Sequence, residues 1–448
     1  MLSICSNQFF SSQDVTIGNY IKLDKVIDYV GRKSLRLRDL GIAIKEFKLI
    51  MDYVDHKYMA HRVDLWMKMA IESGGEVLHL QLGLLGDFVL ETVWTDHLIS
   101  HCPLIEDLTV IDCAVYNPLT REIPLVFEFS SVESLFLHCL QKLKKVNVKG
   151  MHEVYIDASN LESLDYCIHP YASFKLNLDS CTNLRWLRLW NLKSIDLGDE
   201  WFLELFSKVP FLESLKLGNC SMSKRINISS AQLKVLKLSY CSNLEELNID
   251  ARNLLSFAYE GVGLGNNQPG ICFQKSSNQL EVEVNSFSIV DFQDLCSLRK
   301  FVQNIKRASV FLFICWSVLI KPEQGAWQVS SIPPTIKRLE LLFSPEDEAL
   351  YFPFMNYLLS NCCPNYTSVS FCSHVHSKAF TTFLYEMLMG SEEECHCSSS
   401  NSKCWWHALK SVKVLCTFKI DENADFDTML DALPTCYSHE RVGFMLEL

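Results

Sequence analysis

The sequence has no apolar stretch long enough to cross a membrane as a helix. Its longest apolar run, residues 308–320, is shorter than the roughly 20 residues that span a bilayer, so we expect a buried strand there. Residues 1–10 carry no basic segment followed by an apolar one, and no secretory signal is expected. We therefore predict a soluble protein without membrane association, located in the cytoplasm, the nucleus or both.

Positive charge is also scarce. Lysine and arginine number 41 against 53 acidic residues, giving a net charge of -12 over 448 residues. Because affinity for phosphates comes mainly from lysine and arginine, a nucleic-acid partner is not expected. Hydrophobic residues make up 48% of the chain, which is too many for a disordered protein.

Cysteine is too sparse for a small disulfide scaffold. The chain has 19 cysteines in 448 residues, whereas such scaffolds carry roughly 8 to 10%. The number is odd, and many of the cysteines stand beside leucines at regular positions. We expect small buried hydrophobic side chains in a reducing compartment.

Recognisable catalytic motifs are missing as well. There is no Gly-x-Ser-x-Gly elbow, no His-Glu-x-x-His and no phosphate loop. Residues 261–265, Gly-Val-Gly-Leu-Gly, lack the third glycine of a dinucleotide fingerprint, because residue 266 is Asn. Residues 421–427 alternate acidic oxygens, but Phe426 and Ala432 replace the glycine and glutamate of a calcium loop. We expect neither enzymatic activity nor a cofactor.

One group of metal-ligating residues needs separate mention. Cys395, Cys397, Cys404 and His407 would supply enough soft ligands for a tetrahedral zinc ion. Their spacing is not that of a standard zinc finger, and the segment around them is polar and linker-like. The alternative is a set of unpaired thiols beside a loop, and this is the interpretation we adopt.

The strongest pattern is a repeated phrase, Leu-x-x-Leu-x-Leu-x-x-Cys. Its apolar alternation suits a short strand, and the terminal cysteine suits a turn packed inward. Copies begin at Ile105, Leu212 and Leu233, and copies without the cysteine begin at Val132, Leu161 and Leu184. Offsets of 20 to 29 residues with this core are typical of a leucine-rich repeat solenoid, in which neighbouring units stack and share one core.

The spacing also predicts what lies between the copies. Leu244, Leu247 and Ile249 repeat the phrase at half the period, which leaves no room for a return helix, so we expect short extended segments on the convex side. The longer insertion after Leu184 has room for a helix, predicted at residues 201–207. Further strands are expected at 280–284, 310–313, 336–341 and 409–414, and further helices at 61–71, 351–359 and 426–433.

We predict an α/β fold in three parts. Residues 1–75 form a leader and a helical cap, residues 76–345 a leucine-rich repeat solenoid with a curved parallel sheet, and residues 346–448 a C-terminal α/β module with a linker at 390–404. The repeat number within residues 266–332 is left open, because the phrase is too degenerate there.

Strand alternation identifies the side chains that face away from the solenoid core. The expected concave-face residues are Phe136, His138, Trp186, Arg188, Trp190, Lys216 and Lys237. Stacking would align Arg188, Lys216 and Lys237 beside two tryptophans. Tryptophan and arginine are enriched in binding hot spots, so this row would suit an acidic or aromatic protein segment. The alternative is a solvated face whose tryptophans pack on neighbouring repeats.

Three features together resemble the plant F-box proteins that carry leucine-rich repeats and a small C-terminal FBD-type module. They are the repeats, the predicted helix leading into Glu76-Val-Leu-His-Leu, and the tail Cys404-Trp-Trp-His-Ala-Leu-Lys-Ser-Val-Lys. The resemblance runs from about Gly31 to Leu448. It implies the substrate-recognition subunit of a cullin-RING ubiquitin ligase, whose F-box binds the adaptor subunit and whose repeats hold a protein target.

The N-terminus departs from that family. An F-box usually opens with Leu-Pro and closes with a Ser-x-x-Trp phrase, whereas Met1 to Val30 contains neither proline nor tryptophan. Without a box, the chain would be a decoy or scaffold that holds targets without marking them. A third possibility is a small-molecule receptor with a polar pocket around Arg188, Lys216 and Lys237.

Overall fold

The structure is a computed structural model of the chain. It describes residues 2–5, 46–54, 76–84, 105–112, 134–138, 140–150, 153–168, 175–193, 196–261, 269–289, 309–316, 336–343, 368–372, 378–389, 411–416 and 442–447, with single positions within 31–40 and at 428. The chain forms two compact units, Met1–Ser221 and Met222–Leu448, and each is treated by itself.

The first unit is built on a parallel sheet. Its strands, in spatial order, are β1 (Leu2–Cys5), β2 (Glu46–Val54), β3 (Val77–Leu84), β4 (Asp107–Asp112), β6 (Lys145–Lys149), β8 (Ser163–Cys167), β10 (Trp186–Trp190) and β12 (Ser214–Gly218). All neighbouring pairs are parallel. The sheet thus includes β2, ahead of residue 76 where we expected the solenoid to begin.

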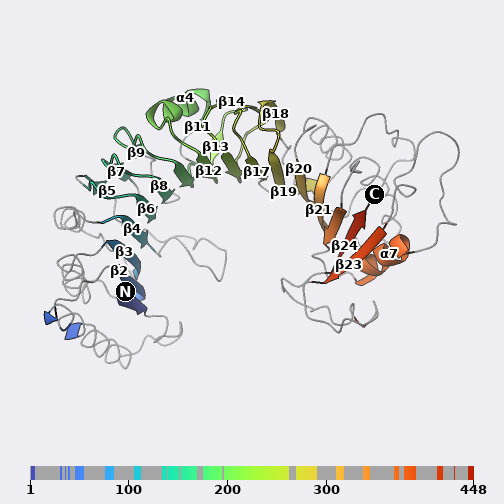
Figure 1. Cartoon of the computed structure of the whole chain (residues 1–448), viewed down its shortest axis with the longest axis horizontal. Coiled ribbons are helices and arrows are strands. Elements are labelled where there is room, and N and C mark those ends of the chain that lie inside the picture. Colours follow the sequence, from blue (N-terminus) through green and yellow to red (C-terminus); the bar gives the residue numbers. More distant parts are fainter. Residues whose placement is uncertain are drawn as a thin grey trace. The chain divides into compact units, whose positions relative to one another are not determined.

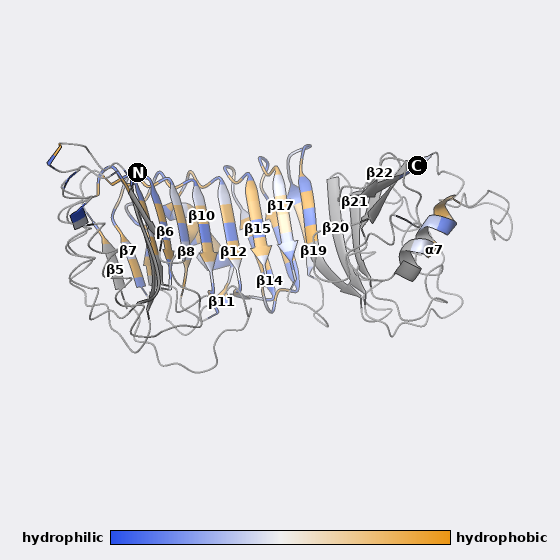
Figure 2. Ribbon diagram, turned by 90° about the horizontal axis from the view of Figure 1, so that it is seen from below, coloured by the Kyte–Doolittle hydropathy of each residue, from blue (hydrophilic) through white to orange (hydrophobic). Residues whose placement is uncertain are grey.

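The repeated phrase explains each of these strands. In β10, Leu187 and Leu189 are buried, and Leu184 in the preceding turn is buried too. Less hydrophobic residues, Trp186, Arg188 and Trp190, alternate with them along β10. Figure 2 shows such alternating hydropathy in β6, β8 and β10. Because one strand cannot bury its own leucines, stacking supplies the core. The predicted parallel solenoid is confirmed.

A second, shorter sheet lies on the other side of the first unit (Figure 1). It contains β5 (Ser134–Leu137), β7 (Glu153–Ile156) and β9 (Lys175–Asn177). The short strand β11 (Asp196–Leu197) and helix α4 (Asp199–Lys208) follow along the chain. The predicted helix at 201–207 is confirmed. The copy of the phrase at Val132, assigned above to the concave sheet, instead supplies β5 of the shorter sheet.

Asparagines connect successive repeats at the turns before three of the main strands. Asn160 Nδ2 donates to Gln141 O at 2.6 Å, and Asn183 Nδ2 donates to Ser159 O at 2.9 Å. In the second unit Asn253 Nδ2 donates to Ala231 O at 2.7 Å. Each asparagine directly precedes the first leucine of a phrase. These bonds satisfy turn carbonyls and fix one repeat against the previous one.

The second unit repeats the two-sheet plan. After β13 (Ser221–Met222) at the unit boundary, its longer sheet runs β15 (Val235–Ser239), β17 (Ser256–Glu260), β19 (Glu281–Ile289), β20 (Ser309–Trp316) and β21 (Ile336–Phe343), all parallel. The shorter sheet contains β14 (Arg225–Ser229), β16 (Glu246–Asp250) and β18 (Gly270–Lys275). The predicted extended return segment around Leu247 is therefore confirmed.

The end of the second unit is an antiparallel sheet with one described helix. Its order is β22 (Ser368–Cys372), β24 (Val442–Glu447) and β23 (Ser411–Cys416), and α7 (Lys378–Met389) lies between β22 and β23 in the chain. The predicted strand at 409–414 overlaps β23, and α7 was not predicted. The predicted linker and the predicted helices at 61–71, 351–359 and, apart from the helical Thr428, 426–433 lie outside the described residues.

The repeat cysteines behave as buried hydrophobic side chains. Cys181, Cys220 and Cys241 are buried thiols that are not part of a disulfide. Their thiols point to main-chain carbonyls, as in Cys220 Sγ to Gly218 O at 3.2 Å and Cys181 Sγ to Ile156 O at 3.6 Å. Burial raises the pKa of the Cys181 thiol to about 11, so the thiol stays protonated and weakly reactive. The inward-packed cysteine of the repeat phrase is confirmed.

Helices are few in the described residues. Within the described part of the two-sheet repeats, α4 is the only helix of more than one turn. The described return segments are therefore mainly strands, and the described repeats form a parallel β-solenoid, consistent with the predicted leucine-rich repeat solenoid. The half-period spacing explains this, because so few residues separate a main strand from its return strand. No described helix has the length and apolar character needed to span a membrane.

Candidate protein-binding face

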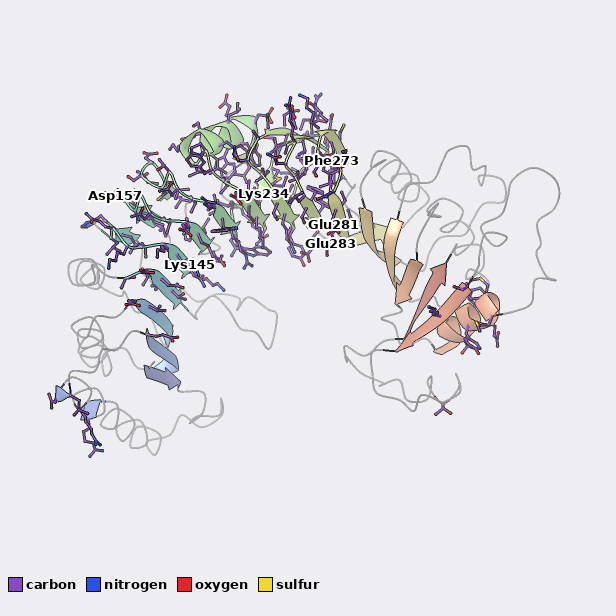
Figure 3. The ribbon with its side chains drawn as sticks, in the orientation of Figure 1. Lys145, Asp157, Lys234, Phe273, Glu281 and Glu283 are labelled. Carbon is purple, nitrogen blue, oxygen red and sulfur yellow. The ribbon has the colours of Figure 1, made fainter. Side chains whose placement is uncertain are left out.

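The outward side chains of β6, β8, β10 and β12 form three rows, which we call the sheet face. The parallel register aligns Lys145, Ser163, Trp186 and Ser214 in the first row, Asn147, Asp165, Arg188 and Lys216 in the second, and Lys149, Cys167, Trp190 and Gly218 in the third. Lys145 lies on this side of the unit in Figure 3. The predicted residues Trp186, Arg188, Trp190 and Lys216 are thus brought together.

The two tryptophans of β10 have different environments. The Trp186 side chain is 45% exposed. Trp190 is half-buried and lies directly over Gly218 of β12, where an added Cβ would stand 2.0 Å from the indole Cε3. Trp186 is therefore available to a partner. Trp190 packs on the neighbouring repeat, which was the alternative interpretation of these residues.

Arg188 is held in place by two neighbours. Its Nη1 lies 3.3 Å from Asp165 Oδ2 on β8, and its guanidinium carbon lies 5.4 Å from the centre of a Trp190 ring. Both interactions restrict the side chain, because the carboxylate attracts the guanidinium and the ring face attracts a cation. The ion pair also offsets the charge of Arg188. Asp165 was not among the predicted site residues.

The other cations of the sheet face have no carboxylate within ion-pair distance among the described residues. Lys216 and Lys145 are exposed and Lys149 is half-buried. Within these four strands the face therefore has four cations (these three lysines and Arg188) against one carboxylate, Asp165. On the neighbouring strand β4, Asp107 aligns with Lys145, and the balance with Asp107 included is still positive. A local positive field on a chain of net charge -12 favours an acidic partner at this place.

A separate column of charges runs along the edge where these strands begin. Glu106, Lys144, Glu162, Arg185 and Glu213 alternate in sign, and main-chain N–H···O bonds link each to the next. Lys144 Nζ lies 2.8 Å from Glu106 Oε2, and Arg185 Nη1 lies 3.2 Å from Glu213 Oε1. Lys144 also lowers the pKa of Glu106 by its hydrogen bond and charge. Four of these charges form two ion pairs and Glu162 adds a negative charge, so this column contributes no net positive charge.

Phe136 and His138 do not belong to this face. Phe136 lies in β5 and is paired with Tyr155 of β7. His138 is the first residue after β5, and it is exposed. Both therefore belong to the shorter sheet, which corrects their predicted position beside the tryptophans. The physical reason is that main and return strands share the same apolar alternation. The place in the longer sheet that we assigned to this copy is occupied by β6, in which valines replace two leucines of the phrase.

Lys237 lies in the second unit, on β15. Its Nζ is 4.0 Å from Glu260 Oε2 of β17, and Tyr240 donates a hydrogen bond to the same carboxylate. The outward residues of β19 add Glu281 and Glu283, labelled in Figure 3. The corresponding surface of the second unit is thus acidic among its described residues, and Lys237 is a paired cation there.

The predicted metal ligands Cys395, Cys397, Cys404 and His407 lie outside the described residues. Among the residues that the structure describes, no three His, Cys, Asp or Glu side chains form a group that could hold a metal ion. On the sheet face, burial raises the pKa of the Cys167 thiol to about 11. The charged and aromatic groups that this face presents are indoles, a guanidinium, ammonium groups and one carboxylate, and these groups suit binding.

Comparison with known proteins supports the repeat assignment. The family model described as "At1g61320/AtMIF1, LRR domain", from a plant family, matches residues 174–313. Neither a curated protein nor a solved structure matches the chain. The matched segment includes β10 with both tryptophans, α4 and the repeats that follow. The chain therefore contains a leucine-rich repeat domain.

Proposed function

We propose that this chain is a non-enzymatic recognition subunit that binds a protein target on the sheet face and presents it to a cullin-RING ubiquitin ligase. The ligase role rests on the resemblance to plant F-box proteins with leucine-rich repeats and an FBD-type module. The binding role rests on the sheet face and on the leucine-rich repeat match.

The observation that carries the binding role is the exposed indole of Trp186 beside unpaired lysines on a rigid sheet. Trp186 is 45% exposed on a strand hydrogen-bonded on both sides. Such a residue loses little conformational entropy when it contacts a partner. Indole contacts also give affinity, whereas the surrounding lysines select acidic partners and accelerate association.

Affinity capture with matched variants tests the binding role. The test variant combines Trp186→Ala with Lys216→Gln, and the control is Leu203→Ala, since Leu203 is a similarly exposed apolar residue on α4. We expect proteins retained by the unaltered chain and by Leu203→Ala to be lost from the test variant. Equal retention by all three proteins would contradict binding on this face.

Co-precipitation with the ligase adaptor subunit tests the ligase role. The 448-residue chain is compared with a form extended by any F-box encoded in frame upstream. Adaptor retained by either form supports the ligase proposal. If both forms retain target but neither retains adaptor, the chain acts as a scaffold or decoy, and the ligase role is refuted while the binding role stands.

A further inference from the structure

We propose that the sheet face recognises an extended segment with two acidic residues four positions apart and an apolar residue midway, lying across strands β6 to β12. This inference rests on the proposed function and specifies its ligand. The negative charges of this segment are the carboxylates of its acidic side chains, and the segment carries no phosphate group.

The positions of the unpaired lysines set the separation of the two acidic residues. Lys145 and Lys149 lie on β6, and Lys216 lies three strands away on β12. At about 4.8 Å per strand, β6 and β12 are roughly 14 Å apart. Four residues of an extended chain cover about 13 Å, and the side chains at both ends then point the same way. A carboxylate at each end would meet a lysine.

The centre of the face selects the middle residue. Halfway between β6 and β12 lie Asp165 on β8 and, on β10, Arg188 and Trp186. The ion pair of Asp165 with Arg188 leaves this centre without a free cation, and Trp186 offers an exposed indole. An apolar residue midway would contact the indole. An acidic residue there would face Asp165, and like charges at close range repel.

The spread of the lysines favours separate carboxylates over one phosphate group. Lys145 and Lys149 are four residues apart on a strand, about 13 Å between their Cα atoms. Lys216 lies in the middle row on β12, which is the strand at the other side of the face from β6. Tight phosphate sites instead gather several donors around one group. Three dispersed lysines match a chain with spaced charges.

Synthetic peptides of identical composition test this pattern on the full chain. One carries Glu-Ser-Phe-Ser-Glu, and the permuted peptide carries Glu-Glu-Phe-Ser-Ser, both within the same neutral flanks. Calorimetry or fluorescence anisotropy gives the Kd of each. We expect the first peptide to bind at least about fivefold tighter, since the permuted peptide has both carboxylates at one end and loses a lysine contact.

Variants of the face assign each contact. We expect Lys216→Gln and Lys145→Gln each to weaken the affinity for the first peptide by about threefold. Each lysine should pair with a different glutamate of the peptide. When that glutamate is changed to glutamine, the corresponding lysine substitution should no longer affect the affinity. Lys193→Gln is the control, because Lys193 is an exposed turn residue after β10. Asp165→Asn specifically improves binding of a peptide whose middle phenylalanine is replaced by glutamate.

The outcomes separate this inference from the proposed function. Equal affinity for the first and permuted peptides, or losses that do not depend on the peptide glutamates, would overturn the pattern. If the peptides do not discriminate while Trp186→Ala with Lys216→Gln still releases captured proteins, the binding role stands and only this ligand pattern fails. A phosphorylated serine peptide that binds more tightly than the two-glutamate peptide would also overturn it.

Discussion

Asn191 and Asn219 show how single residues close the repeats. Both have left-handed backbones, with φ of 68° and 53°, a conformation that asparagine tolerates better than most residues. Asn219 Nδ2 donates to Asn191 Oδ1 at 2.5 Å, and Asn191 Nδ2 donates to Ile168 O at 3.1 Å. The side chains thus continue the connection between repeats beyond the ends of the strands, next to Trp190.

Substitution of Asn191 separates backbone conformation from hydrogen bonding. Both Asn191→Gly and Asn191→Ala remove the hydrogen bonds of the side chain, but only alanine opposes the positive φ. We expect Asn191→Ala to be about 1 kcal/mol less stable than Asn191→Gly, because the left-handed region disfavours a Cβ. Chemical denaturation measures both free energies of unfolding. Equal stability of the two variants would show that φ is not constrained here.

Gly218 is the residue on which Trp190 depends. An alanine Cβ at position 218 would stand 2.0 Å from the indole, so Trp190 must move. We expect Gly218→Ala to lower the free energy of unfolding by about 1 to 3 kcal/mol. Gly270→Ala is the control, because its nearest neighbour, Glu245 O, is 3.8 Å away. Denaturation curves that are the same for both variants would contradict the packing of Trp190.

Two thiols, the half-buried Cys167 and the buried Cys181, predict a pH dependence of stability. The pKa of the Cys167 and Cys181 thiols is raised from about 9 to about 11 by burial. Because the folded state binds these protons more tightly, their contribution to stability is complete below about pH 9 and is lost as the pH rises towards 11. In serine variants of both residues, this loss should shrink. Urea denaturation at a series of pH values gives the slopes.

The same burial predicts reactivity at neutral pH. Mass spectrometry after brief alkylation of the folded chain should find Cys272, which is exposed, modified long before Cys181. Cys272 reacts because reagent reaches its thiol, whereas Cys181 is both covered and protonated. Modification of both at one rate would contradict the burial of Cys181.

At the scale of elements, α4 offers two adjacent residues with opposite roles. Phe202 is 1% exposed and contacts Trp201 edge-on, with ring centroids 5.0 Å apart, whereas Leu203 is 64% exposed. We expect Phe202→Ala to destabilise the chain by about 3 to 5 kcal/mol and Leu203→Ala by less than about 0.5 kcal/mol. Thermal or urea unfolding measures both. Similar losses would mean that α4 packs by another face.

The sequence indicates the kind of strand better than its place. Apolar alternation predicts β10, β12, β15 and β17, because one face of each is buried. It cannot tell a main strand from a return strand, since the return strands β14 and β16 bury alternate residues in the same way. Three main strands, β6, β10 and β12, carry a distinguishing signal two residues past their last apolar position, where Gly150, Asn191 and Asn219 adopt positive φ.

The candidate face could be predicted in part for the same reason. Trp186, Arg188 and Lys216 follow from strands with strong leucine phrases. Lys145, Lys149 and Asp165 were missed, because β6 uses Val146 and Val148, and the phrase of β8 ends in a tyrosine. The ion pair between Asp165 and Arg188 depends on which strands are neighbours, and periodicity within one strand carries no such information.

At the scale of the whole molecule, charge is unevenly distributed. The chain carries a net charge of -12, yet the sheet face of the first unit has four cations against one carboxylate. The equivalent residues described in the second unit, such as Glu281 and Glu283, are acidic. Because exposed charges are screened by salt, binding of an acidic partner should weaken as ionic strength rises. An affinity that does not change with salt concentration would contradict a role of these lysines in binding the partner.

The most direct measurement of the central claim is photo-crosslinking at two exposed positions. A photoreactive amino acid replaces either Trp186 on the sheet face or Leu203 on α4, and adducts are identified by mass spectrometry. We predict a protein adduct at position 186 and none from the same protein at position 203. Adducts with that protein at position 203 but not at 186 would place the binding surface elsewhere and contradict the account.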